Sequence, residues 1–403
     1  MDALMEKLSK MKNTSTQKRF LKKKGYTESD IPSILDKVRF LQRGRRKFPR
    51  ASQMQYTESS LAQASSMEIA KYRSWKVFSK LGKIKHSIDL CGGIGGDAIA
   101  AGLRWKVTVI EKDQSTFDML EHNLEVYNVQ NNVTSILGDI NDLIAQSKFQ
   151  EVIEEADYIF FDPSRRYDDQ RTVKIEEYIP PLSLIDKILP LNQNICVKIA
   201  PGVDIPHIPY ECDIEVVSLR GEVKEIMLWF GNLREHSNSQ NIVATKLPEK
   251  LTLVKNLNKY TESSIELVSN LKKYLYEPDP AAIKAHLIND LAIMFGMSTL
   301  HPQVAYLTSE KYIGSPWLKC YQVIESCPVD IPRIRNLLKK HEIHRIDCKA
   351  RGLTLDLNQI QKELKSKGKN IGLVIFTWVN NEKTAIIAQY LWDFTSSKGS
   401  YVN

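Results

Sequence analysis

Four acidic residues each follow an apolar stretch that is typical of a β-strand: Asp89, Glu111, Asp139 and Asp162. Between Asp89 and Asp97 lies the stretch Leu-Cys-Gly-Gly-Ile-Gly-Gly, and a helix is predicted to begin at about Asp97. Glycine lets the backbone turn sharply and lets a ligand approach it closely. A helix that starts after such a loop directs free N–H groups at a polar ligand. The pattern therefore predicts a site for a ligand that contains a nucleoside.

These side chains need parallel strands that end at one edge of a sheet. A first strand ends at Asp89, and the next strands are expected over residues 106–111, 133–137, 158–161 and 194–199. Residues 212–219 and 223–230, joined at Arg220-Gly221, predict a terminal antiparallel hairpin. Ligands of doubly wound sheets bind at the carboxyl ends of the strands, where the acid after the second strand binds ribose hydroxyls. The sequence thus predicts an α/β fold with its site at that edge.

The series resembles the class I S-adenosylmethionine-dependent methyltransferases over roughly residues 84–231. The stretch from Asp89 to Gly96 is similar to their first motif, and Glu111 matches their ribose-binding acid. Asp139 matches the acid near the adenine amine, and Asp162-Pro163 matches the fourth, catalytic motif. The Cys-Gly-Gly-x-Gly-Gly form is most similar to the trimethylguanosine-synthase-like branch. Ordinary dehydrogenases would instead have G-x-G-x-x-G.

The remainder of the chain resembles the bacterial THUMP-like methyltransferase proteins. The matching segments are residues 61–66 (Leu-Ala-Gln-Ala-Ser-Ser) and 70–73 (Ala-Lys-Tyr-Arg) upstream, and 276–280 (Tyr-Glu-Pro-Asp-Pro) downstream. The resemblance implies a Rossmann-like, seven-stranded class I sheet with a helical N-terminal domain and a C-terminal α+β THUMP-like domain. It also implies S-adenosylmethionine as the cofactor and RNA as the partner.

The resemblance implies roles for particular residues. The expected cofactor contacts are Gln63, Ser65, Asp89, Cys91, Gly92, Gly93, Gly95, Asp97, Glu111, Lys112, Asp139 and Ile140. The expected catalytic residues are Asp162, Pro163 and Arg165, and the expected substrate contacts are Arg165, Arg166, Tyr167, Lys349 and Arg351. Each has a structural alternative: strand-end capping for Asp89 and Glu111, a helix N-cap for Asp139 and for residues 63–66, and an ordinary basic loop for Lys349 and Arg351.

The fourth motif departs from the pattern of enzymes that methylate exocyclic amines, (Asn/Asp/Ser)-Pro-Pro-(aromatic). Ser164 replaces the second proline and Arg165 replaces the aromatic residue. Tyr167 or an arginine plane could stack on a base instead. Arg165 and Arg166 could bind a phosphate, or could pair with nearby acids to stabilise the loop. Three hypotheses follow: an RNA base methyltransferase, a protein or small-molecule methyltransferase, and a non-catalytic RNA-binding scaffold.

Composition narrows the class of protein. The chain has 403 residues, enough for two or three domains, and no apolar run of the roughly 20 residues that a membrane span needs. Its six cysteines form no CxxC pair, and the spacing of His341, His344 and Cys348 fits no standard zinc pattern. We expect a reduced, cytoplasmic protein with no metal and no membrane segment. Nothing in the sequence specifies an oligomeric state.

Positive charge is concentrated at the N-terminus. Residues 1–60 hold 15 basic and 6 acidic side chains, whereas the remaining residues are close to neutral. Apolar residues at helical spacing between the basic ones predict a small helical domain with one basic face. Such a face favours polyanions through phosphate contacts; the alternative is an ordinary solvated helix surface.

The expected domains are 1–80 (basic, helical), 81–235 (methyltransferase), 236–315 (a linker over 232–250 and a helical region over 261–295) and 316–397 (THUMP-like). The last domain alternates strands and helices. Strands are predicted over 318–324 and 343–348, helices over 331–340 and 358–365, and a hairpin over 373–378 and 384–390.

Overall fold

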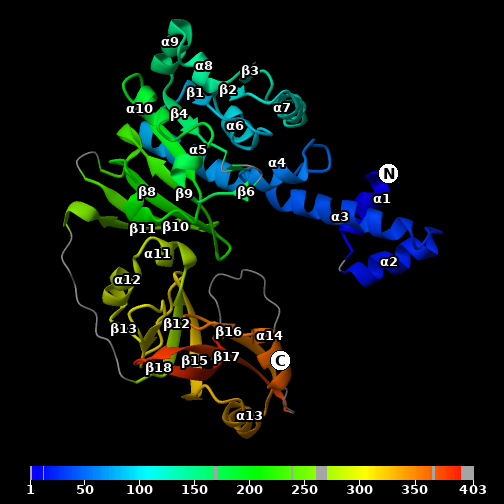
Figure 1. Cartoon of the computed structure of the whole chain (residues 1–403), viewed down its shortest axis with the longest axis vertical. Coiled ribbons are helices and arrows are strands. Elements are labelled where there is room, and N and C mark those ends of the chain that lie inside the picture. Colours follow the sequence, from blue (N-terminus) through cyan, green and yellow to red (C-terminus); the bar gives the residue numbers. More distant parts are fainter. Residues whose placement is uncertain are drawn as a thin grey trace. The chain divides into compact units, whose positions relative to one another are not determined.

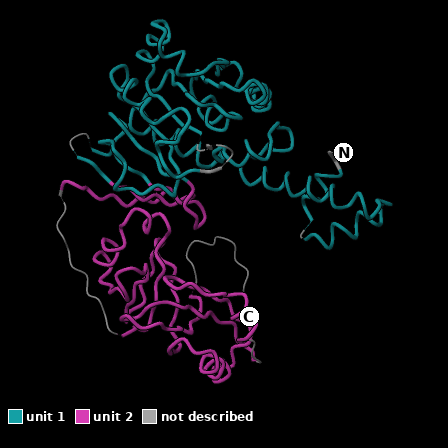
Figure 2. Tube along the Cα trace, viewed as in Figure 1, with its two compact units in different colours: residues 1–215, 225–241 teal, residues 216–224, 242–403 magenta. Residues whose placement is uncertain are grey.

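The computed structural model describes residues 2–11, 13–164, 166–167, 170–236, 239–259, 270–364 and 368–391. The chain divides into two compact units, shown in different colours in Figure 2. The first unit comprises residues 1–215 and 225–241, and the second comprises residues 216–224 and 242–403. The basic helical region and the predicted methyltransferase region therefore lie in one unit.

Three helices at the N-terminus share a small apolar core. They are α1 (Asp2–Ser9), α2 (Thr14–Lys23) and α3 (Asp30–Lys47). The core consists of Leu8, Leu21, Ile31, Leu35 and Val38. Asn13 begins α2 because its side chain accepts a hydrogen bond from the N–H of Thr16 at 2.8 Å. The predicted helical domain is present in this part of the chain.

Two further helices lead into the sheet. They are α4 (Glu58–Gln63), which begins with a capping box at Thr57, and α5 (Met67–Leu81), which begins at the N-cap Ser66. The Ser66 hydroxyl accepts a hydrogen bond from the N–H of Ile69 at 3.4 Å. The N-cap alternative for this segment therefore holds at Ser66.

The sheet of the first unit contains the strands that the acidic residues predict. Its parallel strands are β1 (His86–Asp89), β2 (Lys106–Glu111), β3 (Val133–Leu137), β4 (Tyr158–Phe161) and β7 (Ile195–Ile199). The antiparallel hairpin is β8 (Asp213–Leu219) and β9 (Glu222–Trp229). The strand order is β3-β2-β1-β4-β7-β9-β8, so the class I methyltransferase sheet is confirmed (Figure 1). Two more strands, β10 (Asn241–Leu247) and β11 (Leu251–Asn256), extend this order.

Helices connect these strands. They are α6 (Gly96–Gly102), α7 (Gln114–Val126), α8 (Ile140–Leu143), α9 (Ser147–Glu155) and α10 (Leu184–Ile188). Two short strands, β5 (Arg166–Tyr167) and β6 (Gln170–Arg171), form a hairpin of their own after β4. Strands β1, β4, β7 and β8 are almost entirely buried, whereas only one residue of the edge strand β3 is buried.

The predicted linker over residues 232–250 is wrong. Strand β10 occupies 241–247 and is buried along its whole length. Its polar residues are paired within the fold: the backbone N–H of Asn241 donates to Asp213 at 2.8 Å. A segment rich in Asn, Ser and Lys therefore forms a buried strand, because the sheet supplies hydrogen-bond partners that local composition does not reveal.

The predicted helical region over 261–295 is correct only in part. Residues 260–269 lie outside the described residues. Beyond them, β12 (Tyr274–Pro278) precedes the helices α11 (Pro280–Lys284) and α12 (Ile288–Phe295). The Asp279 side chain caps α11 by accepting a hydrogen bond from the N–H of Ala281 at 2.9 Å.

The second unit contains a seven-stranded sheet in the order β13-β14-β12-β15-β18-β17-β16. Its other strands are β13 (Ser298–Thr299), β14 (Leu307–Ser309), β15 (Leu318–Pro328), β16 (Ile343–Ala350), β17 (Asn370–Val379) and β18 (Glu382–Tyr390). Its helices are α13 (Ile331–Lys340) and α14 (Leu357–Glu363). The predicted α+β elements are present. However, the boundary at 316 cuts this sheet, because β12 pairs with β15.

In the part of the chain that the structure describes, no helix is both long enough and apolar enough to cross a membrane.

Candidate active site

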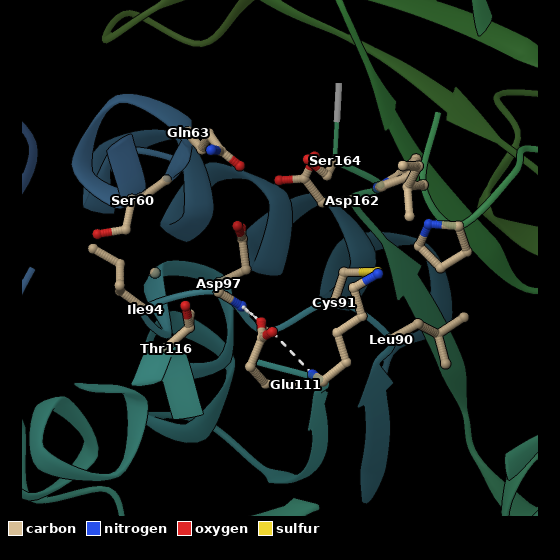
Figure 3. A pocket seen from close by; sticks show the side chains of 18 of the residues that line it. Ser60, Gln63, Leu90, Cys91, Ile94, Asp97, Glu111, Thr116, Asp162 and Ser164 are labelled. Carbon is tan, nitrogen blue, oxygen red and sulfur yellow. Dashed lines mark hydrogen bonds between the residues drawn. The ribbon is translucent and has the colours of Figure 1, made fainter. Parts of the chain in front are cut away.

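A cavity of about 480 Å³ opens where the parallel strands of the first unit end. Figure 3 shows polar side chains around it that come from α4, the glycine-rich loop and the ends of β2 and β4. Its lining includes these predicted cofactor residues: Gln63, Ser65, Cys91, Gly92, Gly93, Asp97, Glu111, Lys112, Asp139 and Ile140. The predicted catalytic residues Asp162 and Pro163 line it as well. The structure thus brings most of the predicted site together.

Two glycines of the loop are required by the backbone. A Cβ on Gly92 would lie 2.4 Å from Cγ2 of Val109, so the loop can approach β2 only with glycine at this position. Gly95 has a φ of +90°, and a Cβ there would lie 2.8 Å from Cδ1 of Leu120. Gly95 is not among the lining residues. Gly95 turns the chain into α6, and its predicted cofactor contact stays a prediction.

Asp89 lies beside the cavity rather than on its lining. It is buried, and its Oδ1 accepts a hydrogen bond from the N–H of Cys91 at 3.3 Å. Its Oδ2 has no hydrogen-bond partner among the described residues. Burial raises the pKa of Asp89 to about 7, and the nearby charge of Asp162 acts in the same direction. A buried carboxylate oxygen without a partner fits a ligand that carries positive charge.

Glu111 is held rigidly at the end of β2. Its Oε2 accepts the N–H of Gly93 at 2.8 Å, and its Oε1 accepts the N–H groups of Lys112 and Asp113 at 2.9 Å each. Because a carboxylate has about four acceptor positions, it can still accept hydrogen bonds from a diol. The position and orientation of Glu111 fit the predicted ribose contact.

Asp139 serves two purposes. Its Oδ1 accepts the backbone N–H of Asn141 at 2.9 Å, so it is the N-cap of α8. Asp139 and Ile140 also line the cavity. The N-cap alternative and the predicted cofactor position are therefore both compatible with the geometry.

Lys198 on β7 is a site residue that sequence reasoning missed. Its ammonium group lies 2.5 Å from Oδ2 of Asp162, and its side chain is 4% exposed. The same nitrogen donates to the Ser65 hydroxyl at 3.2 Å and to the carbonyl of Gln63 at 3.5 Å. A lysine inside the apolar strand Ile-Cys-Val-Lys-Ile was the available signal. Lys198 joins the end of β4 to the segment between α4 and α5.

A second buried cation lies behind the glycine-rich loop. Arg73 of α5 pairs with Asp97 and, at 2.5 Å, with Glu225 of β9. Its guanidinium also lies 4.2 Å from the ring centre of Phe160. Asp97 therefore lines the cavity with one oxygen already engaged. Glu225 is buried and, through its pair with Arg73, helps to fix α5 against the sheet.

The cavity is also lined by residues that follow Asp162 in the chain, most of them apolar. They are Pro163, Ser164, Thr172, Val173, Ile179, Pro180 and Pro201. Ser164 and Ile179 exchange two backbone hydrogen bonds, at 2.7 and 3.0 Å, which close the base of the loop that carries the Arg-Arg-Tyr sequence. Among the described residues, no aromatic side chain lines the cavity.

The predicted substrate contacts in this loop are only partly described. Arg165 lies outside the described residues, and Arg166 and Tyr167 are described only as the backbone of β5. Their predicted roles in phosphate binding and base stacking stay predictions.

Lys349 and Arg351, the other predicted substrate contacts, belong to the second unit. Both donate to the carboxylate of Glu277, at 2.9 and 3.0 Å, and the Tyr321 hydroxyl donates to it at 2.6 Å. Burial alone would raise the pKa of Glu277, but these donors and the two positive charges lower it overall. Both cations are bound to an internal partner, and their predicted RNA contact stays a prediction.

Glu277 also explains the Tyr-Glu-Pro-Asp-Pro motif. Glu277 forms the cluster just described, and Asp279 caps α11 while accepting a hydrogen bond from the Ser218 hydroxyl at 2.6 Å. The Tyr276 hydroxyl accepts the N–H of Ile313 at 2.8 Å. The motif therefore organises the second unit rather than a reaction.

Over the described ranges, no group of three His, Cys, Asp or Glu side chains could hold a metal ion. The ring of His341 instead lies 2.7 Å from Glu325.

Comparison with known proteins agrees with this geometry. Residues 84–218 match the family model of the RNA cap guanine-N2 methyltransferases, and residues 318–389 match that of the THUMP-like domain. The sheet domain of the chain is similar to S-adenosylmethionine-dependent methyltransferases, and its fold is that of class I. The first match coincides with the parallel sheet and the cavity, and the second with strands β15 to β18.

Two proteins that are similar over most of this chain are named as S-adenosylmethionine-dependent methyltransferases. Uncharacterized S-adenosylmethionine-dependent methyltransferases from two strains of Mycobacterium tuberculosis, CDC 1551 / Oshkosh and ATCC 25618 / H37Rv, are each 24% identical over 347 residues. This alignment covers 84% of the present chain and 89% of each relative. A crystal structure from Porphyromonas gingivalis W83, of a protein named as a methyltransferase, is similar over 96% of this chain and 94% of its own. Its TM-score is 0.72 at 21% identity, so it shares the fold.

Proposed function

We propose that this methyltransferase transfers a methyl group from S-adenosylmethionine to a base of structured RNA. The observation that carries the proposal is the carboxylate of Asp162, which lines the cavity and is held by Lys198. The similarity of residues 84–218 to RNA cap guanine-N2 methyltransferases and the THUMP-like domain support RNA as the substrate.

The cavity fits the cofactor chemically. S-adenosylmethionine, when bound, supplies a methyl group on a positively charged sulfur. Asp89, Glu111, Asp139 and Asp162 give this part of the protein a negative charge that suits a cation. Glu111 would hold the ribose hydroxyls, Asp139 and Ile140 would meet the adenine, and the loop from Cys91 to Gly93 would face the methionine part. Gln63 and Ser65 would cover the cofactor from the side of α4.

Asp162 is the group that would handle the acceptor. Methyl transfer is an in-line displacement, so the protein acts mainly by orienting the nucleophile. Lys198 engages Oδ2 of Asp162, which leaves Oδ1 to accept a hydrogen bond from the nucleophile and to favour loss of its proton. The apolar surfaces of Pro163, Pro180 and Pro201 would contact the flat faces of the base, in place of the aromatic residue found in related motifs.

The test is methyl transfer from tritiated S-adenosylmethionine to total RNA taken from cells that lack this protein. Label in RNA that disappears with Asp162→Ala, while calorimetry shows unchanged cofactor affinity, would support the proposal. RNA from cells that contain the protein is the matched control, since its sites are already methylated.

Each other outcome points to a different activity. Label in protein or in a small-molecule fraction would replace RNA as the acceptor. Cofactor binding without any transfer to RNA, protein or small molecules would leave a cofactor-binding protein without turnover. Absence of cofactor binding would favour a scaffold that retains the fold alone.

A further inference from the structure

The outward side of α2 forms a continuous cationic surface. Gln17 and Leu21 are the buried residues of this helix. Residues four apart lie above one another on a helix, so Lys18 and Lys22 form one row and Arg19 and Lys23 form the next. Both rows lie opposite the buried side, and all four side chains are exposed. We name these four residues the α2 basic face.

The cations of the α2 basic face are available to a partner. Among the described residues, the only carboxylate that pairs with any of them is Glu28, which contacts Lys22 and is 79% exposed. Such an exposed pair contributes little and exchanges readily. By contrast, the neighbouring arginines Arg39, Arg43 and Arg45 on or near α3 each have an acidic partner: Asp36, Glu58 and Glu6 respectively. The pairs at Arg39 and Arg43 are exposed as well, so the contrast is one of number: three arginines of α3 have an acidic partner, whereas one of the four cations of the α2 basic face has one among the described residues.

Helix α2 is linked to the cavity through α3. Helix α2 packs on α1 and α3 through their common core (Figure 1). At the last residue of α3, the Lys47 ammonium donates to the carbonyls of Leu61, Ala62 and Ala64 at 2.7, 3.1 and 2.6 Å. These carbonyls belong to α4 and the segment after it, which line the cavity and contact Lys198. A ligand bound to α2 is therefore bound to a group of packed helices that also contacts the lining of the cavity.

The chain segment that follows α3 is held against the sheet domain as well. The N–H of Gln55 donates to Oδ1 of Asn123 at 2.8 Å, and the Asn123 amide donates back to the Gln55 carbonyl at 2.9 Å. The ring of His122 contacts the carbonyl of Gln53 at 2.9 Å. These bonds join the chain that follows α3 to α7 of the sheet domain, so the connection does not depend on Lys47 alone.

We propose that the α2 basic face docks the phosphate backbone of the RNA that carries the methyl acceptor. The inference rests on the proposed function and extends it by naming the surface that binds the substrate away from the reacting base. Phosphates attract exposed cations and release counterions when bound. An anionic membrane fits less well, because the apolar residues of α2, Phe20 and Leu21, face the three-helix core and leave no apolar anchor.

The test compares two triple variants of the full-length protein. The first, Lys18→Gln, Arg19→Gln and Lys23→Gln, removes three charges from the α2 basic face and spares the Lys22–Glu28 pair. The second, Lys83→Gln, Arg104→Gln and Lys187→Gln, removes two lysines and one arginine that are equally exposed near the opposite, amino edge of the sheet. Binding of a labelled, folded RNA is measured by fluorescence anisotropy over a series of salt concentrations.

We expect the α2 variant to bind RNA about 10- to 100-fold more weakly at physiological salt, with the slope of log K against log salt reduced by about two to three. The control variant should stay within about twofold of the wild type. With RNA as the methyl acceptor, the α2 variant should show a raised KM and an almost unchanged kcat. Cofactor affinity should be the same in all three proteins, which verifies their fold.

Equal losses in the two variants, or no loss in either while the wild type binds RNA, would overturn the docking surface and leave the proposed function standing. If the wild type binds no RNA at any salt concentration, the proposed function itself fails. If the α2 variant loses affinity only for vesicles of anionic phospholipid, the surface serves a membrane and the inference is wrong.

Discussion

Two carboxylate–lysine clusters in this molecule look alike and differ in what surrounds them. In the first unit, Lys198 binds one oxygen of Asp162, and the carboxylate lines a cavity. In the second unit, Lys349, Arg351 and Tyr321 all donate to Glu277, which is not among the residues that line this cavity. An ion pair therefore indicates a reaction site only where its carboxylate also faces a cavity that can hold a ligand.

Replacing the carboxylate of Asp162 should lower the rate of methyl transfer strongly, whereas replacing that of Glu277 should leave the rate almost unchanged. With Asp162→Asn we expect methyl transfer to fall by about 10²- to 10⁴-fold, because the group that accepts the nucleophile's hydrogen is weakened. Cofactor affinity should change little, whereas the melting temperature should fall, because the buried Lys198 loses its counter-charge. Single-turnover transfer to RNA, with calorimetric titration of the cofactor, checks both parts. A variant that keeps its rate would remove Asp162 from the catalytic role.

Lys198→Met should have the next largest effect on rate. The cation orients Asp162 and ties it to Ser65, so we expect kcat to fall by about 10- to 100-fold with little change in cofactor affinity. Lys198→Arg should recover part of the loss, since it keeps the charge. A purely structural lysine would instead lower the melting temperature without shifting kcat in the soluble, folded fraction, and this result would contradict the positioning role.

Glu277→Gln should leave activity within about twofold but destabilise the second unit. Loss of the carboxylate leaves Lys349 and Arg351 half-buried without a counter-charge, which costs about 2 kcal/mol, or about 4–8 °C in melting temperature. Because the pKa of Glu277 is lowered in the folded state, its stabilising contribution is present above the ordinary pKa of a glutamate. The contribution is lost as pH falls through the lowered pKa. Melting curves at pH 7 and pH 3 check this prediction, and an equal loss at both pH values would contradict it.

Asp89 extends the comparison to a buried carboxylate with no cationic partner on its free oxygen. Its pKa, raised to about 7 by burial, means that the folded protein binds this proton more tightly than the unfolded chain does. The ligand-free protein should therefore lose stability as pH rises from about 4 through 7. Asp89→Asn should remove that loss and raise the melting temperature at pH 8 by about 2–4 °C or more.

The same ionisation should favour a cationic ligand. We expect the wild type to bind S-adenosylmethionine more tightly at pH 8 than at pH 6, and Asp89→Asn to bind it weakly at both. A wild-type affinity that does not change over this range would show that Asp89 does not face the positive part of the ligand.

The smallest effect is expected for Lys349→Gln. Its ammonium group is already bound to Glu277, so RNA affinity should change by less than about twofold and the salt slope should stay the same. The anisotropy titration that tests the α2 basic face measures this as well. A loss as large as that of the α2 variant would mean that Lys349 leaves Glu277 for RNA.

The sequence predicts the acidic strand ends well because the apolar strand and the acid that follows it are neighbours in the chain. Asp89, Glu111 and Asp162 each follow a short apolar strand, and the observed strands β2, β3 and β4 have the predicted bounds. The glycine-rich loop is equally local, since its shape depends on residues that have no Cβ. The seven-stranded order then follows from the family resemblance.

The features that sequence analysis missed depend on distant partners. Lys198 meets Asp162 only when β4 and β7 lie side by side, and Glu277 lies far along the chain from Lys349 and Arg351. Strand β10 was missed for the same reason, because its polar residues have distant partners: Asn241 donates to Asp213, and Lys246 donates to the carbonyl of Pro316. The sequence shows which charged and polar groups the chain contains. Only the tertiary structure shows which of them already have a partner and which can bind a ligand.

The hairpin between β8 and β9 has a consequence for how this enzyme can be divided. Residues 216–224 belong to the second unit, although the strand segments on both sides of them belong to the first. In the sheet order, β10 is the neighbour of β8. A fragment that ends near residue 235 would expose the backbone of β8 as an open edge that invites aggregation. The predicted methyltransferase domain is therefore not expected to fold well as a separate fragment. Gene fusions or exchanges between relatives should keep residues 84–256 together.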